Sequence, residues 1–133
     1  MTAALTDAQK ALFNEVVFAV VGTINPDGRP QLSVVWVKTD GDDILFSTTE
    51  GRRKQLNLVA DPRVTILVNP PTNPYSYIEV RGTATMTTEG GRELIDELAK
   101  KYMDADRYPM DDGTDNVRVI VRIKPEHVVT MGQ

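Results

Sequence analysis

Hydrophobic and β-branched residues recur along most of the chain in short runs with a period of two, which is typical of strands. Segments rich in Pro, Gly, Asn and Asp separate these runs, and the separators at 25–28 and 39–42 predict tight turns between antiparallel neighbours. We therefore expect a three-strand meander followed by further strands, the last of them short, at residues 17–24, 31–38, 43–48, 64–69, 75–87, 117–124 and 128–131.

Two residues predict irregularities within these strands. Gly82, inside the long 75–87 strand, marks a bend or a bulge, because a glycine there has no side chain to pack. Pro125 lacks the backbone N–H that a sheet needs, so we expect it to break the chain between the strand at 117–124 and the one at 128–131.

Three segments change to a helical pattern. Thr6 followed by Gln9 resembles a capping box and predicts a short first helix. A second helix is expected at 51–60, ending before Pro62 because the residue that precedes a proline avoids the helical region. The clearest helix is expected at 89–105, where every fourth position is apolar or aromatic at Leu94, Leu98 and Tyr102.

Six or seven antiparallel strands in a chain of 133 residues favour closure into a barrel, because closure leaves few strand edges exposed. We therefore expect a mainly β protein with a few helices, folded as a six- or seven-stranded antiparallel barrel. The helices would cover its ends or seams. The length fits a single domain over residues 1–133.

The composition is that of a folded protein, with 41% hydrophobic and 26% charged residues. The absence of cysteine excludes disulfides, thiolate zinc sites and cysteine nucleophiles. The net charge of −4 argues against a general nucleic-acid binder, and no apolar run approaches the ~18 residues of a membrane span. Because the N-terminus lacks the basic and apolar regions of a signal peptide, we expect a cytoplasmic protein without a nucleic-acid or membrane partner.

The sequence offers little support for a set of catalytic side chains of a known type. One histidine, His127, cannot supply a multi-histidine metal site, so no metal is expected. The sequence contains no G-x-S-x-G, Walker A or G-x-G-x-x-G motif. Carboxylate pairs such as Asp42-Asp43 and Asp111-Asp112 lie in turn-like segments, where solvated acids are more common than an acid/base pair.

The segment 47–54 is the best candidate for a binding site, because a strand end, three hydroxyls and a glycine precede a basic triplet that opens a helix. Hydroxyls donate hydrogen bonds to phosphate oxygens, an arginine such as Arg52 grips two oxygens, and Lys54 adds a point charge. Cations at a helix N-terminus are unfavourable against the helix dipole, and a bound anion would relieve that cost. A solvated basic turn is the alternative that these residues alone leave open.

An ordered series of short pieces over half the chain resembles the pyridoxamine-phosphate-oxidase-like split β-barrel flavoproteins. The pieces are Val20-Val21-Gly22-Thr23-Ile24, Asp27-Gly28-Arg29-Pro30-Gln31-Leu32-Ser33, Phe46-Ser47-Thr48, Arg52-Arg53-Lys54-Gln55-Leu56-Asn57-Leu58 and Asp61-Pro62-Arg63-Val64. Within that group, the Gly28-Arg29-Pro30-Gln31 stretch and the short length look most like the actinobacterial branch that uses the deazaflavin coenzyme F-420.

The resemblance implies a homodimeric oxidoreductase that binds coenzyme F-420 between two split barrels. The reduced deazaflavin would pass a hydride to a small organic acceptor, and the protein would supply position and electrostatics. This leaves the catalytic residues unassigned, with Tyr77, Tyr108 and solvent as open choices for a proton donor. An FMN-dependent oxidase or reductase, a non-catalytic flavin or deazaflavin carrier, and a cofactor-free structural barrel are the alternatives.

The resemblance also implies a set of cofactor-binding residues. The phosphate would be held by Arg52 and Lys54, with help from the hydroxyls of Ser47, Thr48 and Thr49. The ring would lie along one strand, at Gln31, Ser33, Val35 and Trp36, although Trp36 fits a core position equally well. Arg53 would point to solvent or toward the acidic tail of the cofactor. By position alone, the partner subunit would add Asn69, Tyr75 or Tyr77.

Overall fold

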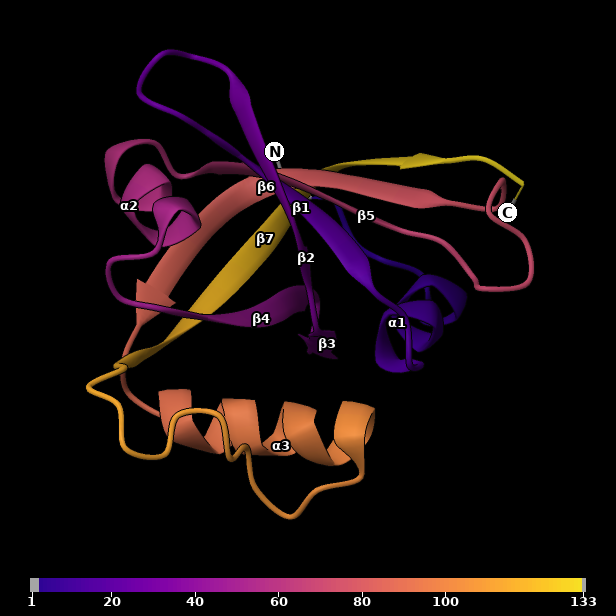
Figure 1. Cartoon of the computed structure of the whole chain (residues 1–133). Coiled ribbons are helices and arrows are strands. Elements are labelled where there is room, and N and C mark those ends of the chain that lie inside the picture. Colours follow the sequence, from indigo (N-terminus) through magenta and orange to yellow (C-terminus); the bar gives the residue numbers. More distant parts are fainter. Residues whose placement is uncertain (1–2, 133) are drawn as a thin grey trace.

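In the computed structural model, which describes residues 3–132, the chain forms one curled sheet of seven antiparallel strands with three helices around it (Figure 1). The strands are β1 Ala19–Ile24, β2 Pro30–Val35, β3 Val37–Asp40, β4 Asp43–Thr49, β5 Arg63–Val68, β6 Ile78–Thr87 and β7 Arg118–Thr130. The helices are α1 Asp7–Asn14, α2 Arg53–Ala60 and α3 Gly91–Met103. The expected mainly β, antiparallel split barrel is confirmed, with seven strands.

The sheet closes through a bend at Trp36. The strand order is β2-β1-β5-β6-β7-β4-β3, so β2 and β3 lie at opposite edges although they are consecutive in the chain. The expected single strand at 31–38 and the three-strand meander are therefore wrong. Residues 30–35 pair only with β1, residues 37–40 pair only with β4, and Trp36 between them belongs to neither ladder.

The two longest strands, β6 and β7, pair through an irregularity at Gly82. The register shifts between Arg81 and Gly82, and Gly82 lies opposite Pro125, so the expected bulge is confirmed. The expected break at Pro125 is wrong, because β7 runs unbroken to Thr130. Proline is tolerated at a bulge, and pairing of β7 with β4 has already ended at Ile123, so the missing N–H costs no ladder bond there.

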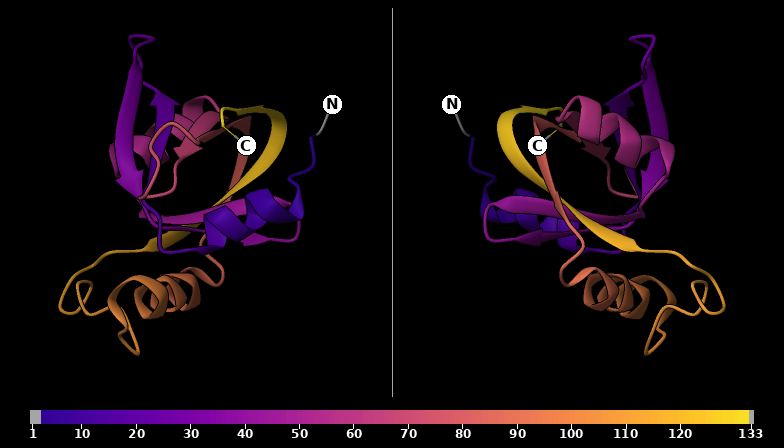
Figure 2. Two further views of the ribbon diagram at one scale, coloured as in Figure 1. Left: turned by 90° about the vertical axis from the view of Figure 1, so that its right-hand side faces the viewer. Right: turned by 90° about the vertical axis from the view of Figure 1, so that its left-hand side faces the viewer.

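The barrel interior is filled by side chains from every strand and from α1. Phe13 and Phe46 are fully buried in it, and the capping box of Thr6 and Gln9 starts α1 as expected. Helix α2 buries Asn57 and Leu58 and leaves Leu56 exposed. Figure 2 shows α3 outside the barrel, where it covers a second apolar cluster. No helix within residues 3–132 is long and apolar enough to cross a membrane.

Candidate functional site

A cavity of about 170 Å³ lies where the start of α2, the end of β4 and the bend after β2 face the inner side of α3. Such a volume is below the roughly 300–1,000 Å³ of sites that enclose a drug-sized ligand, and it suits a small group or one end of a larger molecule. Its lining residues are Val34, Val35, Trp36, Ser47, Thr48, Arg52, Lys54, Ile95, Leu98, Tyr108 and Arg118.

The first wall of the cavity carries positive charge without a counter-ion. Arg52 is the N-cap of α2, and its Nε donates to Thr49 Oγ1 over 3.0 Å. Lys54 is half-buried, and desolvation together with the nearby Arg52 lowers its pKa. Within residues 3–132, neither residue forms an ion pair with a carboxylate. An anion bound here would therefore relieve both the burial of Lys54 and its repulsion from Arg52.

The floor of the cavity holds a hydroxyl without a partner. Thr48 is 3% exposed, and its Oγ1 has no hydrogen-bond partner among the described residues. A buried polar atom without a partner costs about 1–3 kcal/mol, so such atoms mark places where a ligand or water is expected. Together with Ser47 beside it, Thr48 gives the cationic wall the hydrogen-bond donors that a phosphate group uses.

The second wall is aromatic and is fixed by one tyrosine hydroxyl. Trp36 stacks on Tyr102 with ring centroids 5.1 Å apart, and it meets Tyr108 edge-on at 5.9 Å. The Tyr102 hydroxyl donates to Val17 O over 2.6 Å and accepts from Val37 N over 3.1 Å. Burial raises the pKa of Tyr102, so this hydroxyl stays protonated and ties Val37, directly after Trp36, to Val17 ahead of β1.

We expect Tyr102→Phe to lower the free energy of unfolding by about 2 kcal/mol, because the Val17 carbonyl and the Val37 N–H both lose their hydroxyl partner. Urea denaturation followed by Trp36 fluorescence measures the change. Tyr75→Phe is the matched control, since Tyr75 is 79% exposed, and it should change stability by less than about 0.5 kcal/mol. Equal stability of both variants would mean that Tyr102 does not hold the bend.

A third wall comes from β7 and from the loop at 104–117. Arg118 forms a paired contact with Asp111, Nε to Oδ2 over 2.6 Å and Nη2 to Oδ1 over 2.9 Å. The side chains are only 11% and 7% exposed. Hydrogen bonding to Arg118 lowers the pKa of Asp111, so the carboxylate stays charged. The ring of Tyr108 lies 4.7 Å from Arg118 Cζ.

The structure brings together six of the thirteen residues expected to bind a cofactor, and two more lie directly behind them. Those lining the cavity are Val35, Trp36, Ser47, Thr48, Arg52 and Lys54. Thr49 supports Arg52, and Arg53 extends toward Asn57 Oδ1 at 3.5 Å. Asn57 itself is buried and donates to Thr23 and Asn25, which ties α2 to the β1–β2 hairpin.

The other five expected residues do not line this cavity. Gln31 accepts from Thr23 Oγ1, and Ser33 has a buried Oγ without a partner in the described chain. Asn69, Tyr75 and Tyr77 lie at the loop between β5 and β6, outside the cavity of their own chain.

Sequence reasoning missed part of the cavity lining. Ile95 and Leu98 lie on the apolar face of α3, a helix that the sequence predicts. No sequence pattern indicates that this face packs near the basic segment at 52–54. Arg118 alternates with the buried Val119 and Val121 along β7, a pattern typical of a position that faces away from the core. Its pairing with Asp111 joins a strand to a loop, and only the fold brings them together.

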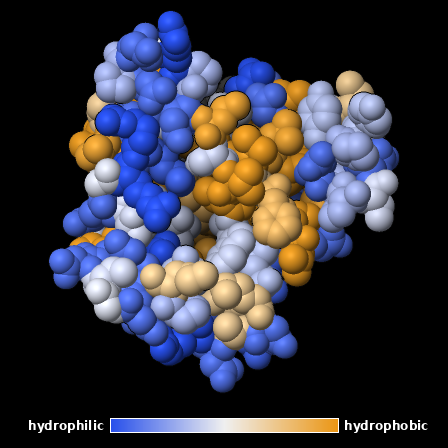
Figure 3. All heavy atoms as spheres, viewed as in Figure 1, coloured by the Kyte–Doolittle hydropathy of each residue, from blue (hydrophilic) through white to orange (hydrophobic). Residues whose placement is uncertain are grey.

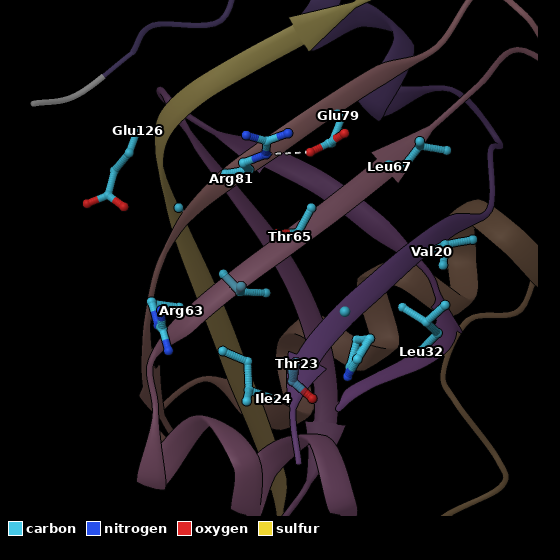
Figure 4. A pocket seen from close by; sticks show the side chains of 14 residues that line it. Val20, Thr23, Ile24, Leu32, Arg63, Thr65, Leu67, Glu79, Arg81 and Glu126 are labelled. Atoms are coloured by element: carbon cyan, nitrogen blue, oxygen red, sulfur yellow. Dashed lines mark hydrogen bonds and ion pairs between the residues drawn. The ribbon is translucent and has the colours of Figure 1, made fainter. Parts of the chain in front are cut away.

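A larger groove, of about 690 Å³, lies on the outer face of the sheet. Figure 3 shows hydrophobic residues gathered over β1 and β2, and Figure 4 shows Val20, Leu32 and Leu67 around the groove, with the Arg81–Glu79 ion pair beyond them. The pairing register sets Val34, Val20 and Leu67 in one row across three strands. Leu32 and Val34 are each 64% exposed, and Phe18 is 58% exposed.

Comparison with known proteins gives a match over nearly the whole chain. The family model described as pyridoxamine 5'-phosphate oxidase matches residues 5–132. The structure of an F-420 reductase superposes with a TM-score of 0.82 at 28% identity, covering 94% of this chain and 98% of that one.

Two further solved structures share the fold at lower identity. A conserved hypothetical protein from Mycobacterium tuberculosis gives a TM-score of 0.76 at 24% identity, covering 96% of this chain and 84% of that one. A putative pyridoxamine 5'-phosphate oxidase from Listeria innocua gives 0.69 at 16% identity, covering 92% and 94%.

Proposed function

Because the chain belongs to the pyridoxamine 5'-phosphate oxidase family, we propose that it is an oxidoreductase that uses coenzyme F-420, anchored by Arg52 and Lys54, to reduce a small organic acceptor. The likeness to the F-420 reductase, at 28% identity over almost the full length of both chains, favours the deazaflavin over FMN.

One observation carries this proposal: two cations without a counter-ion converge beside a buried hydroxyl without a partner. Arg52, Lys54 and Thr48 line the same cavity. Half-burial of Lys54 and the unpartnered hydroxyl of Thr48 are costly in the protein alone, and a phosphate group would satisfy both while pairing with the exposed Arg52. A solvated basic turn would leave Lys54 in water, whereas this side chain is half-buried. The arrangement therefore fits the phosphate of a bound cofactor.

The size of the cavity decides which part of the cofactor enters it. About 170 Å³ holds a phosphate and a short stretch of chain, but a three-ring system needs more room. The ring would therefore lie outside the cavity, along β2 and Trp36. There the backbone groups of Gln31 and Ser33, both in β2, could contact it. When bound and reduced, the deazaflavin supplies the hydride. The protein orients it and keeps its anionic end fixed, which is the positioning contribution to catalysis.

The apolar row on β2, β1 and β5, exposed at Val34 and Val20, favours a homodimer that completes this ring site. Exposed apolar patches of several hundred Å² are uncommon on monomers and often mark interfaces. In such a dimer, the partner subunit would bring Asn69, Tyr75 or Tyr77 toward the ring, since these residues lie away from the cavity of their own chain. We propose that two copies of the chain pack through this face.

We expect Leu32→Asp to raise the dimer dissociation constant about 30-fold, roughly 2 kcal/mol, because it buries a charge at the contact. Sedimentation velocity over a concentration series measures the constant. Met110→Asp is the control, since Met110 is 66% exposed but lies in the loop at 104–117. If Leu32→Asp leaves the dimer intact, the interface lies elsewhere.

A fluorescence titration of the purified protein with F-420, FMN and FAD tests the choice of cofactor. We expect F-420 to bind most tightly, and tighter binding of FMN would favour an FMN-dependent oxidase or reductase. Reduced F-420, incubated with a panel of acceptors and followed by its return to the oxidised absorbance, tests turnover. Tight binding without oxidation by any acceptor would indicate a non-catalytic carrier.

A further inference from the structure

We propose that Arg118, on β7, is a third cation of the anion site and that it grips the ligand's phosphate from the wall opposite α2. The inference rests on the proposed function for the identity of the ligand, a phosphate ester. It assigns a binding role to a residue on the face of β7 opposite the buried Val119 and Val121. It also gives the loop at 104–117 a part in the site.

The guanidinium of Arg118 is held by a carboxylate on one side and faces a neutral hydroxyl on the other. Asp111 accepts from Nε and from Nη2, which uses one edge of the planar fork. The remaining nitrogen, Nη1, donates to Ser47 Oγ over 3.4 Å, and Ser47 lines the cavity. Because a guanidinium has five donors in a fixed plane, holding one edge on Asp111 directs Nη1 to the cavity side.

The surroundings of Arg118 hold it in this orientation. Tyr108 covers one face of the guanidinium at 4.7 Å. Asp111 is held in turn by Asn116 Nδ2 at 2.9 Å and by Arg92 Nη1 at 3.6 Å. Arg118 lines the cavity while Asp111 does not, so the cation stands between its carboxylate and the ligand. A bound phosphate would therefore meet Arg118 directly and Asp111 only from behind it.

The pairing of β4 with β7 brings the two cationic walls to one place. Thr49 lies opposite Arg118 in the register, and Thr49 Oγ1 accepts from Arg52 Nε. The end of β4, with Ser47 and Thr48, thus lies between Arg52 on one side and Arg118 on the other. A phosphate resting on β4 would receive donors from both walls, which restricts its orientation more than α2 alone could.

Arg122, four residues further along β7, supplies a matched contrast. Its Nη1 and Nη2 donate to Asp43 and Asp40, so both outer nitrogens are engaged. It does not line the cavity. The two outer nitrogens of Arg122 therefore both meet carboxylates, whereas Nη1 of Arg118 meets only a neutral hydroxyl of the cavity wall.

The test uses the double variant Arg118→Gln/Asp111→Asn, which removes both charges together and leaves no unpaired buried ion. We expect the dissociation constant of F-420, from fluorescence quenching, to rise at least about tenfold, or 1.4 kcal/mol. We also expect a weaker dependence on salt, because one screened contact is lost. Arg122→Gln/Asp43→Asn is the control and should stay within twofold. Arg118→Lys keeps the charge and should retain the salt dependence.

Calorimetric titration with pyrophosphate alone separates this inference from the proposed function. If the parent protein binds F-420 and the double variant binds it equally well, Arg118 is not part of the site. An affinity loss with unchanged salt dependence would show that Arg118 acts by packing, and would also overturn the inference. If pyrophosphate binding depends on Arg118 but no flavin or deazaflavin binds, the inference holds and the proposed cofactor is wrong. Binding of neither probe would overturn both.

Discussion

Replacing Arg52 and Lys54 together by alanine should weaken the binding of coenzyme F-420 by about 300-fold or more. Each residue would contribute a charge-assisted hydrogen bond to the phosphate, worth roughly 1.5–3 kcal/mol, and two such losses exceed 3 kcal/mol. The estimate is at the lower end of that range because the variant also removes the repulsion that lowers the pKa of Lys54. Fluorescence titration of parent and variant at one ionic strength measures the ratio.

The matched control removes two cations that do not line the cavity. Lys100→Ala/Lys124→Ala changes the net charge by the same amount, and both residues are exposed. We expect its affinity for F-420 to stay within twofold of the parent, which would exclude a general field effect. A loss below tenfold for Arg52→Ala/Lys54→Ala would mean that the phosphate is held elsewhere, whatever the control shows.

The Arg52→Ala/Lys54→Ala variant should be no less stable than the parent in the absence of ligand. Arg52 and Lys54 raise each other's electrostatic cost, and neither has a carboxylate partner within residues 3–132. Removing them relieves that repulsion, so we expect the melting temperature of the unliganded protein to stay level or to rise. Loss of binding without loss of stability is the behaviour of a binding site, where local physical rules are broken for function.

The parts of the fold that sequence predicted well are those with a local cause. The capping box at Thr6 and the bulge at Gly82 follow from the chemistry of one or two residues. The bend at Trp36 could not be predicted in this way, because the alternating pattern continues through it. Only the pairing of β2 with one neighbour and β3 with another shows where the strand divides.

The residues of the candidate site also fall into two groups, those that the sequence indicates locally and those that only the fold brings together. The basic triplet is contiguous, so the sequence alone singles it out as a candidate phosphate site, and the structure places Arg52 and Lys54 in one cavity. Tyr108 comes from the loop at 104–117 and Arg118 from β7, and no spacing in the sequence shows the Asp111–Arg118 contact that joins them. The residues Asn69, Tyr75 and Tyr77 were chosen by position, and their role depends on a second subunit.

Gly82→Ala should lower the free energy of unfolding by about 3 kcal/mol, because β7 crosses β6 too closely for a side chain. A Cβ at this position would lie 2.2 Å from Lys124 O and 3.0 Å from Ile123 Cγ2. The nearest atom is backbone, so it cannot rotate away, and β7 itself would have to move by roughly 1 Å. For a chain of this length the loss corresponds to a fall of about 10 °C in melting temperature, measured by calorimetry.

Gly22→Ala is the control for this effect, because it too adds a methyl group to a glycine within the sheet. Its Cβ would lie 3.1 Å from Leu32 Cδ2, the end of a flexible side chain, so we expect a change within about 1 kcal/mol. Equal effects of the two substitutions would contradict the close approach at the bulge.

Arg118 lies at the far end of β7 and is paired there with β4, so Gly82→Ala should leave the affinity for F-420 within threefold at a temperature where the variant is folded. A larger loss would show that the bulge and the anion site are coupled through β7.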